Sequence, residues 1–238
     1  MIRKNGMELN EVLKELKKMS LDPEAVGGRE RFDSTSRSVY GVFIPKLRKL
    51  AKAVGCNHQY ALRLWQIAIR ETRVLAGMIV DPSRVSETLM EEWVRDLDHW
   101  EVCDQTCQNV FEKTAIAYDK AAQWSNREEE YVKRAAFVMM ARLAICDKQA
   151  IDERFSEFLS HIQREAGDER PMVKKAVNWA LRQIGKRNPF LNEQAIKVAL
   201  TIRENNPSKD ARWIASDALR ELQSATLQER LHNHGLAS

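Results

Sequence analysis

Helical periodicity recurs along almost the whole chain, and this pattern constrains the fold more than any other feature. Glycine and proline are sparse, with nine and six residues in 238, and strand-like alternation is nearly missing. Apolar residues instead repeat at the three- and four-residue spacing of amphipathic helices. The sequence therefore predicts an all-α protein. The expected helices cover residues 10–19, 45–54, 60–80, 82–95, 99–118, 120–124, 128–145, 151–165, 171–185, 192–203 and 210–223.

Several of these helices resemble one another, with a polar or basic start that runs into small apolar residues. This pattern begins at Glu71, Tyr131, Met172 and Asp210. The basic residues Arg134, Lys175 and Arg212 are 41 and 37 residues apart, close to the period of HEAT or armadillo repeats. We therefore expect a right-handed helical solenoid of HEAT-like repeats with a concave basic surface, formed by residues 1–238 as a single domain. A plain helical bundle is the alternative.

Composition narrows the class of protein. Hydrophobic residues make up 44% and charged residues 30%, as in ordinary globular proteins. No apolar run approaches 18 residues and the N-terminus has no hydrophobic signal region, so we expect a cytoplasmic protein. The net charge of +4 permits nucleic-acid binding without requiring it. Four cysteines in a chain of this length do not form a disulfide framework.

The stretch 171–189 places a tryptophan outside a helical core. At about 100° per residue, one apolar arc contains Val173, Ala176, Val177, Ala180, Leu181 and Ile184. Trp179 lies on another flank, and three cations share that flank with it. They are Lys175, Arg182 and Lys186, at spacings of three and four residues. Core packing does not require this arrangement. It suits the binding of a polyanion with flat rings, or of a cationic ligand presented on a polyanion.

Two segments near the N-terminus are also basic. Segment 27–38 is rich in hydroxyl groups and arginine, which is typical of a surface loop, with phosphate contact as the alternative. Further along, Pro45 marks a helix start, and Lys46, Arg48 and Lys49 crowd its first turn. Positive charge there opposes the helix dipole. An anion bound nearby would offset this cost, and solvated surface charge is the other interpretation.

Segment 98–107 contains the groups of greatest chemical interest. Asp98 and Glu101 have the spacing of a capping box, so a helix is expected from His99. Trp100 and Asp104 then lie one turn apart on the same face. A carboxylate beside an aromatic surface can stabilise positive charge that develops next to a stacked ring. An exposed acid beside a peripheral tryptophan is the alternative.

The same helix carries a spacing that metal sites use. His99, Cys103 and Cys107 follow one another at four-residue steps. No fourth ligand is evident, and cysteine is also a good small core residue. We expect no metal.

A third basic position is Arg134. The helix around it is apolar on two sides, and Arg134 stands alone among Val138, Ala141 and Ile145. A helix of this kind is largely buried, and a buried guanidinium requires a carboxylate or a phosphate. An internal ion pair with Asp104 and a phosphate clamp both remain open.

With these residues in view, the whole chain resembles the AlkD-like DNA alkylation repair proteins, which are HEAT-like-repeat DNA glycosylases. The resemblance follows the motifs Tyr40-Gly-Val, Pro45-Lys-Leu-Arg-Lys-Leu-Ala-Lys, Arg70-Glu-Thr-Arg-Val-Leu-Ala, Asp98-His-Trp-Glu-Val-Cys-Asp, Val132-Lys-Arg-Ala-Ala and Lys174-Lys-Ala-Val-Asn-Trp-Ala-Leu-Arg. Their order and spacing together are fairly specific. The resemblance places the family's catalytic aspartate at Asp104, its lesion-flanking tryptophans at Trp100 and Trp179, and its backbone-binding arginine at Arg134.

The resemblance implies hydrolysis of the N-glycosidic bond of positively charged N3- and N7-alkylated purines in double-stranded DNA, without base flipping. It further implies a monomer that needs no cofactor and no membrane, works in the nucleoid, and holds phosphates with Arg134, Lys175 and Arg182. Lys186, Lys46 and Arg48 complete the expected DNA contacts.

The sequence departs from the family pattern at two places. His99 stands where better-characterised relatives have a further tryptophan, and Phe43 and Ile44 replace two polar residues before the family's proline. Some relatives bind DNA without glycosylase activity. The alternative function is therefore a non-catalytic HEAT-repeat protein that binds damaged or branched DNA, and a protein-binding scaffold is a third possibility.

Overall fold

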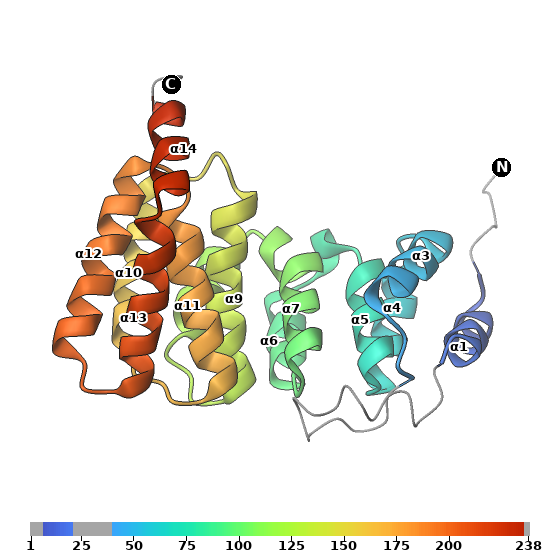
Figure 1. The fold of residues 1–238 in the computed structure, drawn as a ribbon. Helices are drawn as coiled ribbons and strands as arrows, with labels where there is room; N and C mark the ends of the chain where they lie inside the picture. The colour runs from blue at the N-terminus through green and yellow to red at the C-terminus, as the bar shows by residue number, and fades with distance from the viewer. Residues whose placement is uncertain (1–6, 21–39, 236–238) are drawn as a thin grey trace. The chain divides into compact units, whose positions relative to one another are not determined.

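The structure is a computed structural model that describes residues 7–20 and 40–235. Within these ranges it contains thirteen α-helices, two short 3-10 helices and no strand, so the all-α prediction is confirmed (Figure 1). None of the helices in the described ranges combines the length and the apolar character that a bilayer crossing requires. Segment 27–38, a candidate phosphate contact, lies outside the described residues.

The chain divides into two compact units, residues 1–114 and 115–238, and the expectation of one domain stays a prediction. In the first unit α5 packs against α3, α4 and α7. Trp65 of α4 and Trp93 of α6 stack face to face, with their ring centroids 4.0 Å apart. The helices are α1 (Leu9–Lys18), α3 (Ile44–Val54), α4 (His58–Gln66), α5 (Arg70–Ile79), η2 (Pro82–Arg84), α6 (Glu87–Arg95), α7 (Trp100–Asn109) and η3 (Phe111–Lys113).

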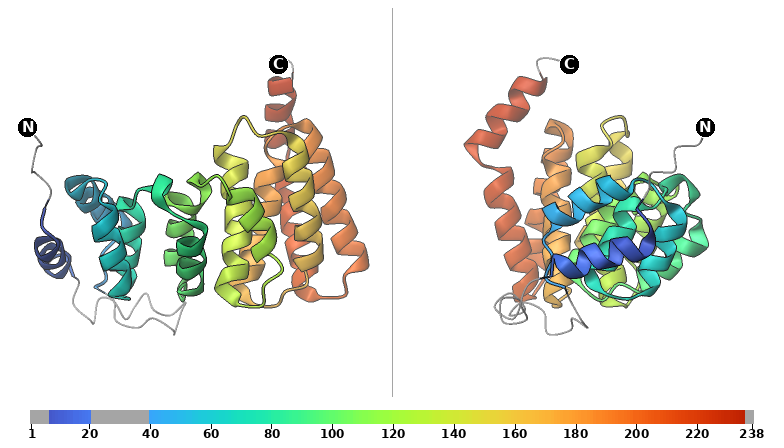
Figure 2. Two further views of the ribbon diagram at one scale, coloured as in Figure 1. Left: turned by 180° about the vertical axis from the view of Figure 1, so that it is seen from behind. Right: turned by 90° about the vertical axis from the view of Figure 1, so that its right-hand side faces the viewer.

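The second unit consists of two layers of helices. Its helices are α8 (Ala117–Trp124), α9 (Glu130–Cys146), α10 (Asp152–Glu165), α11 (Pro171–Gly185), α12 (Pro189–Asn205), α13 (Lys209–Leu222) and α14 (Ala225–Gly235). One layer is formed by α8, α10 and α12, and the other by α9, α11 and α13 (Figure 2). Each connection returns the chain to the opposite layer, as in stacked HEAT-like helix pairs. The terminal helix α14 packs on α12 and α13.

The buried positions of α9, α11 and α13 define which residues of these helices correspond in the repeat. From α9 to α11 the buried positions are 41 residues apart, as in Val132 and Val173. From α11 to α13 they are 38 residues apart, because Val173 corresponds to Ala211 and residues 176 and 180 correspond to 214 and 218. The predicted equivalence of Lys175 and Arg212 is therefore wrong by one residue. Lys175 corresponds to Trp213, since apolar packing sets the register and an exposed cation does not.

Several expected helices are shorter than the sequence pattern suggested. The expected helix 60–80 is two helices, because the chain turns at Ala68, whose φ of 57° is left-handed. Thr72 then caps α5, where its hydroxyl contacts the Ile69 backbone N–H at 3.3 Å and carbonyl at 2.8 Å. No glycine or proline marks this break, so the apolar periodicity alone predicted one continuous helix. Similarly, segment 82–95 begins with η2, and segment 99–118 ends in η3 and the first turn of α8.

The C-terminal segment is helical, and α14 extends to Gly235. Leu227 and Leu231 are both buried, with 6% and 4% of their surface exposed. Burial of two leucines one turn apart explains why this short polar segment stays helical.

Candidate nucleic-acid interface

Helix α7 presents Trp100 and Asp104 on one side and buries the other. Trp100 is the first residue of the helix and is 38% exposed. Asp104, one turn later, is partly exposed. The inward side of α7 consists of small or apolar residues, namely Val102, Cys103, Thr106 and Cys107. The predicted pairing of an exposed ring with a carboxylate is therefore present on this helix.

The start of α7 differs from the prediction by one residue. His99 is the N-cap, and its Nδ1 accepts a hydrogen bond from the Glu101 backbone N–H at 3.1 Å. Asp98 instead lies 3.2 Å from Nη1 of Arg73, so the expected Asp98 capping box is wrong. Arg73 is itself fixed by a 2.6 Å hydrogen bond to the Asp96 carbonyl and by the ring of Trp65. These tertiary contacts hold the Asp98 carboxylate near Arg73.

The burial of His99 bears on whether its ring can stack on DNA and on whether it can form a metal site with Cys103 and Cys107. The side chain is only 7% exposed, so its ring serves the helix start and is not a stacking surface. Cys103 and Cys107 are fully buried on the inner side of α7. In the part of the chain that the structure describes, no three His, Cys, Asp or Glu residues are arranged to hold a metal ion.

The electrostatic surroundings of Asp104 are acidic. Glu101 lies one turn before it, and burial raises the pKa of Glu101. The charges of Glu71 and Asp104 raise this pKa further, against the opposing effect of Arg70. Arg70 lies 3.5 Å from Glu101 and 2.8 Å from Glu71, so this group of carboxyl groups already contains one cation.

Sequence reasoning missed Glu71, which organises the segment before α3. Its carboxylate is fully buried and accepts backbone hydrogen bonds from Tyr40 at 3.0 Å and Val42 at 3.2 Å. Arg70 donates to it at 2.8 Å and lies 3.5 Å from Glu101. A buried carboxylate requires such partners. Glu71 and Arg70 therefore connect the start of α3 with the Asp104 helix.

The cations of α3 are all on the surface. Lys46, Arg48 and Lys49 are exposed, and Pro45 occupies the second position of the helix. Phe43, the residue before the helix, is 42% exposed. An exposed phenylalanine beside exposed cations agrees with both interpretations of this helix start, a bound anion and solvated surface charge.

Arg134 has a partner that the sequence did not suggest. The residue is 7% exposed, as expected for a helix that is buried on several sides. Its Nη1 donates a 2.6 Å hydrogen bond to the carbonyl of Met172, in the first turn of α11. Arg134 thus joins α9 to the next helix of its layer.

Helix α11 is arranged as predicted. All six residues of the expected apolar arc are at most 1% exposed. Trp179 lies outside this arc and is partly exposed, and Lys175 is fully on the surface. With its amide oriented to suit both neighbours, Gln183 accepts hydrogen bonds from Trp179 Nε1 and Lys186 Nζ, each at 3.0 Å. This contact holds the indole along the cationic flank.

The three cations of this flank differ in their partners. Arg182 Nη1 and Lys186 Nζ each lie 2.7 Å from a carboxylate oxygen of Glu221 on α13. Burial alone would raise the pKa of Glu221, but the hydrogen bonds from Lys186 and Arg182 lower it overall. Lys175, by contrast, has no hydrogen-bond or ion-pair partner among the described residues. Lys175 is therefore the cation most available to an external phosphate.

A second exposed tryptophan follows Lys175 in the repeat register. Trp213 of α13 is 45% exposed, and Lys174 Nζ lies 5.2 Å from the centre of its ring. Lys174 also bonds to Asp210 at 2.6 Å. The sequence pattern alone did not single out Trp213, because the 38-residue register in which it corresponds to Lys175 follows from burial.

Comparison with known proteins identifies the family. A family model described as DNA alkylation repair enzyme matches residues 12–222, nearly the entire chain. The chain belongs to this family. No curated protein sequence matches it.

Solved structures show which fold this DNA alkylation repair family member shares. One, described as "A new family of proteins related to the HEAT-like repeat DNA glycosylases with affinity for branched DNA structures", has a TM-score of 0.76 at 21% identity. That match covers 94% of this chain and 96% of the other. A designed armadillo repeat protein in complex with a (KR)4 peptide gives a TM-score of 0.37 at 15% identity, with coverages of 96% and 88%. The first comparison confirms the HEAT-like fold.

The candidate residues of this family member fall into separate groups. Trp100 and Asp104 share α7, and Lys46 and Arg48 share α3, all in the first unit. The second unit contains Arg134 on α9. It also contains the α11 face, which we define as Lys175, Trp179, Arg182 and Lys186.

Proposed function

We propose that the protein is a DNA glycosylase that removes positively charged N3- and N7-alkylated purines by hydrolysis of the N-glycosidic bond, without base flipping. The family match supports this proposal. The observation that carries it is the arrangement on α7, where exposed Trp100 precedes the partly exposed Asp104 carboxylate by one turn. That arrangement suits a substrate that gains positive charge on its sugar.

The chemistry follows from the charge of the lesion. An alkylated purine that already carries positive charge is a good leaving group, so the departing base needs no general acid. As the bond breaks, the deoxyribose becomes an oxocarbenium-like cation. The Asp104 carboxylate would stabilise this cation and orient the water that attacks it, while Trp100 would pack on the sugar through cation–π contacts. Trp179 of the second unit is a further candidate for contact with the substrate.

The remaining residues would hold the DNA backbone. Lys175 would contact a phosphate directly, and Arg134 would do so while it keeps its bond to Met172. Arg182 and Lys186 would share their charge between Glu221 and the DNA. Lys46 and Arg48 of α3 complete the set. Neutralisation of phosphates by these cations makes the binding dependent on salt.

The test is release of free alkylated base from methylated duplex DNA by the wild type and by Asp104→Asn. Loss of an electrostatic stabiliser of this kind lowers the rate by about 100-fold or more. Binding to the undamaged duplex should stay within about twofold, because the substitution removes no cation. Asp119→Asn is the matched control, since Asp119 is exposed on α8 and its loss changes the charge by the same amount. Equal release by Asp104→Asn and wild type would remove Asp104 from the mechanism.

One observation favours a second function, which is binding of branched DNA without excision. His99 replaces a tryptophan of the active relatives, and its ring is buried at the helix start, where it offers no stacking surface. The solved relative is itself described by its affinity for branched DNA. Under this alternative the wild type would release no base, and it would bind a four-way junction more tightly than a linear duplex of equal length.

A further inference from the structure

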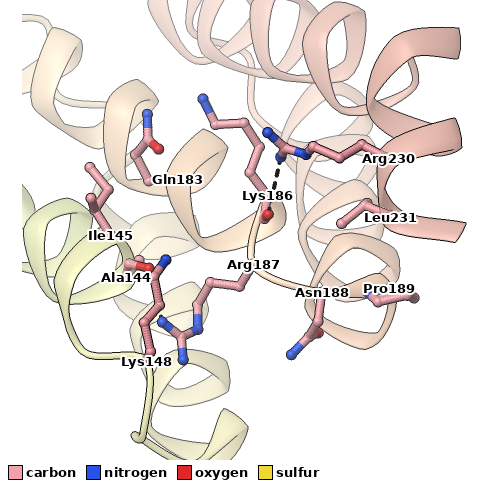
Figure 3. Close-up of a pocket in the computed structure, with 10 residues that line it drawn as sticks. All are labelled: Ala144, Ile145, Lys148, Gln183, Lys186, Arg187, Asn188, Pro189, Arg230 and Leu231. Atoms are coloured by element: carbon pink, nitrogen blue, oxygen red, sulfur yellow. Dashed lines mark hydrogen bonds between the residues drawn. The ribbon is translucent and has the colours of Figure 1, made fainter. Parts of the chain in front are cut away.

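The second unit contains a pocket at the end of α11. Its volume is about 600 Å³, and it lies between the last turn of α9, the α11–α12 connection and α14 (Figure 3). The ten residues that line it are Ala144, Ile145, Lys148, Gln183, Lys186, Arg187, Asn188, Pro189, Arg230 and Leu231. Its size falls within the range of small-ligand sites. We refer to it as the α12 pocket.

The α12 pocket is strongly basic. Four of its lining residues are cations, Lys148, Lys186, Arg187 and Arg230, and none is acidic. Glu221, outside the lining, bonds to Lys186 at 2.7 Å and offsets part of this charge. In the described part of the chain, Lys148 and Arg230 are exposed and pair with no carboxylate. The positive end of the α12 dipole also points here, because Pro189 is the first residue of that helix.

Internal hydrogen bonds fix the walls of the pocket. Arg187 donates to the carbonyls of Ala144 and Asp147 at 2.9 and 2.8 Å and lies over the ring of Phe155 at 4.0 Å. These bonds hold its charge at the end of α9. Arg230 reaches across from α14 and donates to the Lys186 carbonyl at 3.3 Å (Figure 3). The pocket is therefore a fixed feature of the second unit.

Lys186 connects this pocket with the α11 face. It belongs to the cationic flank of α11 and also lines the pocket. Eleven residues separate it from Lys175, which corresponds to about 16 Å along a helix. A DNA strand carries a phosphate at every nucleotide, so a strand that runs along the α11 face from Lys175 presents further phosphates at the pocket end of this distance. A polyanion held at Lys175 is thereby directed towards the pocket.

We propose that the α12 pocket binds the backbone phosphates of the same DNA strand that the α11 face contacts. Lys148 and Arg230 are the phosphate ligands, and Arg187 supplies fixed positive charge behind them. The apolar side chains of Ile145, Pro189 and Leu231 line the remaining wall, where a deoxyribose can pack. This proposal rests on the DNA-binding part of the proposed function and does not require base excision.

The experiment measures binding of an undamaged DNA duplex by the full chain over a series of salt concentrations. The test variant is Lys148→Ala/Arg230→Ala. The control variant is Lys197→Ala/Arg203→Ala, which removes the same charge from exposed positions of α12 away from the pocket. Each lost phosphate contact lowers the salt slope of log K by about 0.9. We expect a slope shallower by about two in the test variant and unchanged in the control.

The outcomes separate this proposal from the proposed glycosylase function. A slope that is unchanged in the test variant, or that falls equally in both variants, overturns the pocket assignment and leaves base release untouched. A salt slope that falls only in the test variant, together with no base release by the wild type, supports phosphate binding in the pocket and argues against glycosylase activity. Wild type that binds no DNA overturns both. Saturable binding of inorganic pyrophosphate, lost in the test variant while the DNA slope is unchanged, would instead identify a site for small phosphates.

Discussion

Two glycines that lie within helices show how much one missing side chain can matter. Gly185 ends α11, and a Cβ atom added there would lie 2.7 Å from Leu222 Cδ2 and 2.8 Å from Ala195 Cβ. Gly77 lies in α5, where the nearest atom to an added Cβ is Val110 Cγ2 at 3.6 Å. Gly185 therefore permits the close approach of α12 and α13 that places Lys186 beside the α12 pocket.

Substitution by alanine at these two glycines should change the free energy of unfolding in opposite directions. Gly185→Ala overpacks a close contact, and we expect it to lower the free energy of unfolding by about 1–3 kcal/mol. Gly77→Ala meets only ordinary contacts and improves helix propensity, so an increase of about 0.5–1 kcal/mol is expected. Urea unfolding measures both values. A Gly185→Ala protein as stable as the wild type would show that α12 and α13 can move apart without cost.

At the scale of helices, buried cations connect one repeat to the next. Lys133 of α9 is 5% exposed, and its Nζ lies 2.6 Å from a Glu165 oxygen at the end of α10. Burial alone would raise the pKa of Glu165, but hydrogen bonds from Lys133 and Arg164 lower it overall. At the corresponding position of α11, Lys174 forms a bond of equal length with Asp210. The lysine thus recurs with the 41-residue repeat, whereas its acidic partner comes from α10 in one case and from α13 in the other.

The lowered pKa of Glu165 predicts a dependence of stability on pH. A carboxyl group whose pKa is lower in the folded state stabilises the fold above its unfolded value, near 4.5, and loses that contribution as the pH falls through the folded value. We expect Glu165→Gln to reduce the free energy of unfolding by about 1–3 kcal/mol at pH 7, because it leaves Lys133 without its closest anion. The loss of stability on acidification below pH 4.5 should then be shallower than in the wild type.

Glu157→Gln is the control for this measurement. Glu157 lies on the same helix and is exposed, so its substitution should change the stability little at any pH. Chemical denaturation at several pH values gives both curves. If Glu165→Gln and wild type lose stability in parallel below pH 4.5, then the Lys133–Glu165 pair does not cause the acid dependence.

At the scale of the whole molecule, a net charge of +4 says little about DNA binding, and the distribution of cations says more. Arg182 and Lys186 are both engaged by Glu221, and Arg134 bonds to a backbone carbonyl. Lys175 is exposed and has no such partner in the described ranges. Under the proposed function, binding of DNA and cleavage of the glycosidic bond therefore depend on different residues.

Substitution of Lys175 should separate these two roles. In Lys175→Ala we expect the salt slope of DNA binding to become shallower by about 0.9, because one phosphate contact is lost. The rate of base release at saturating protein concentration should stay within about threefold of the wild type. Lys197→Ala is the control of equal charge. A rate that falls sharply even at saturation would show that Lys175 acts in the chemical step as well.

Much of the candidate site could be predicted because it depends on local patterns. The apolar arc of α11 and the exposed flank beside it follow from helix geometry, and so does the one-turn spacing of Trp100 and Asp104. The family resemblance then gave these positions their proposed roles. Glu71, by contrast, resembles any surface glutamate in the sequence, and only its bonds to Tyr40 and Val42 reveal that it is buried.

The sequence by itself determined the helical class, the repeat and the family, because amphipathic periodicity and motif order are properties of neighbouring residues. The tertiary structure decided which groups meet across 30 to 45 residues of chain. It placed Met172 against Arg134, Glu221 against Arg182 and Lys186, and Arg230 beside the α12 pocket. It also broke the chain at Ala68 and set the register of α13. Such contacts depend on how whole helices pack, and no local pattern in the sequence records that packing.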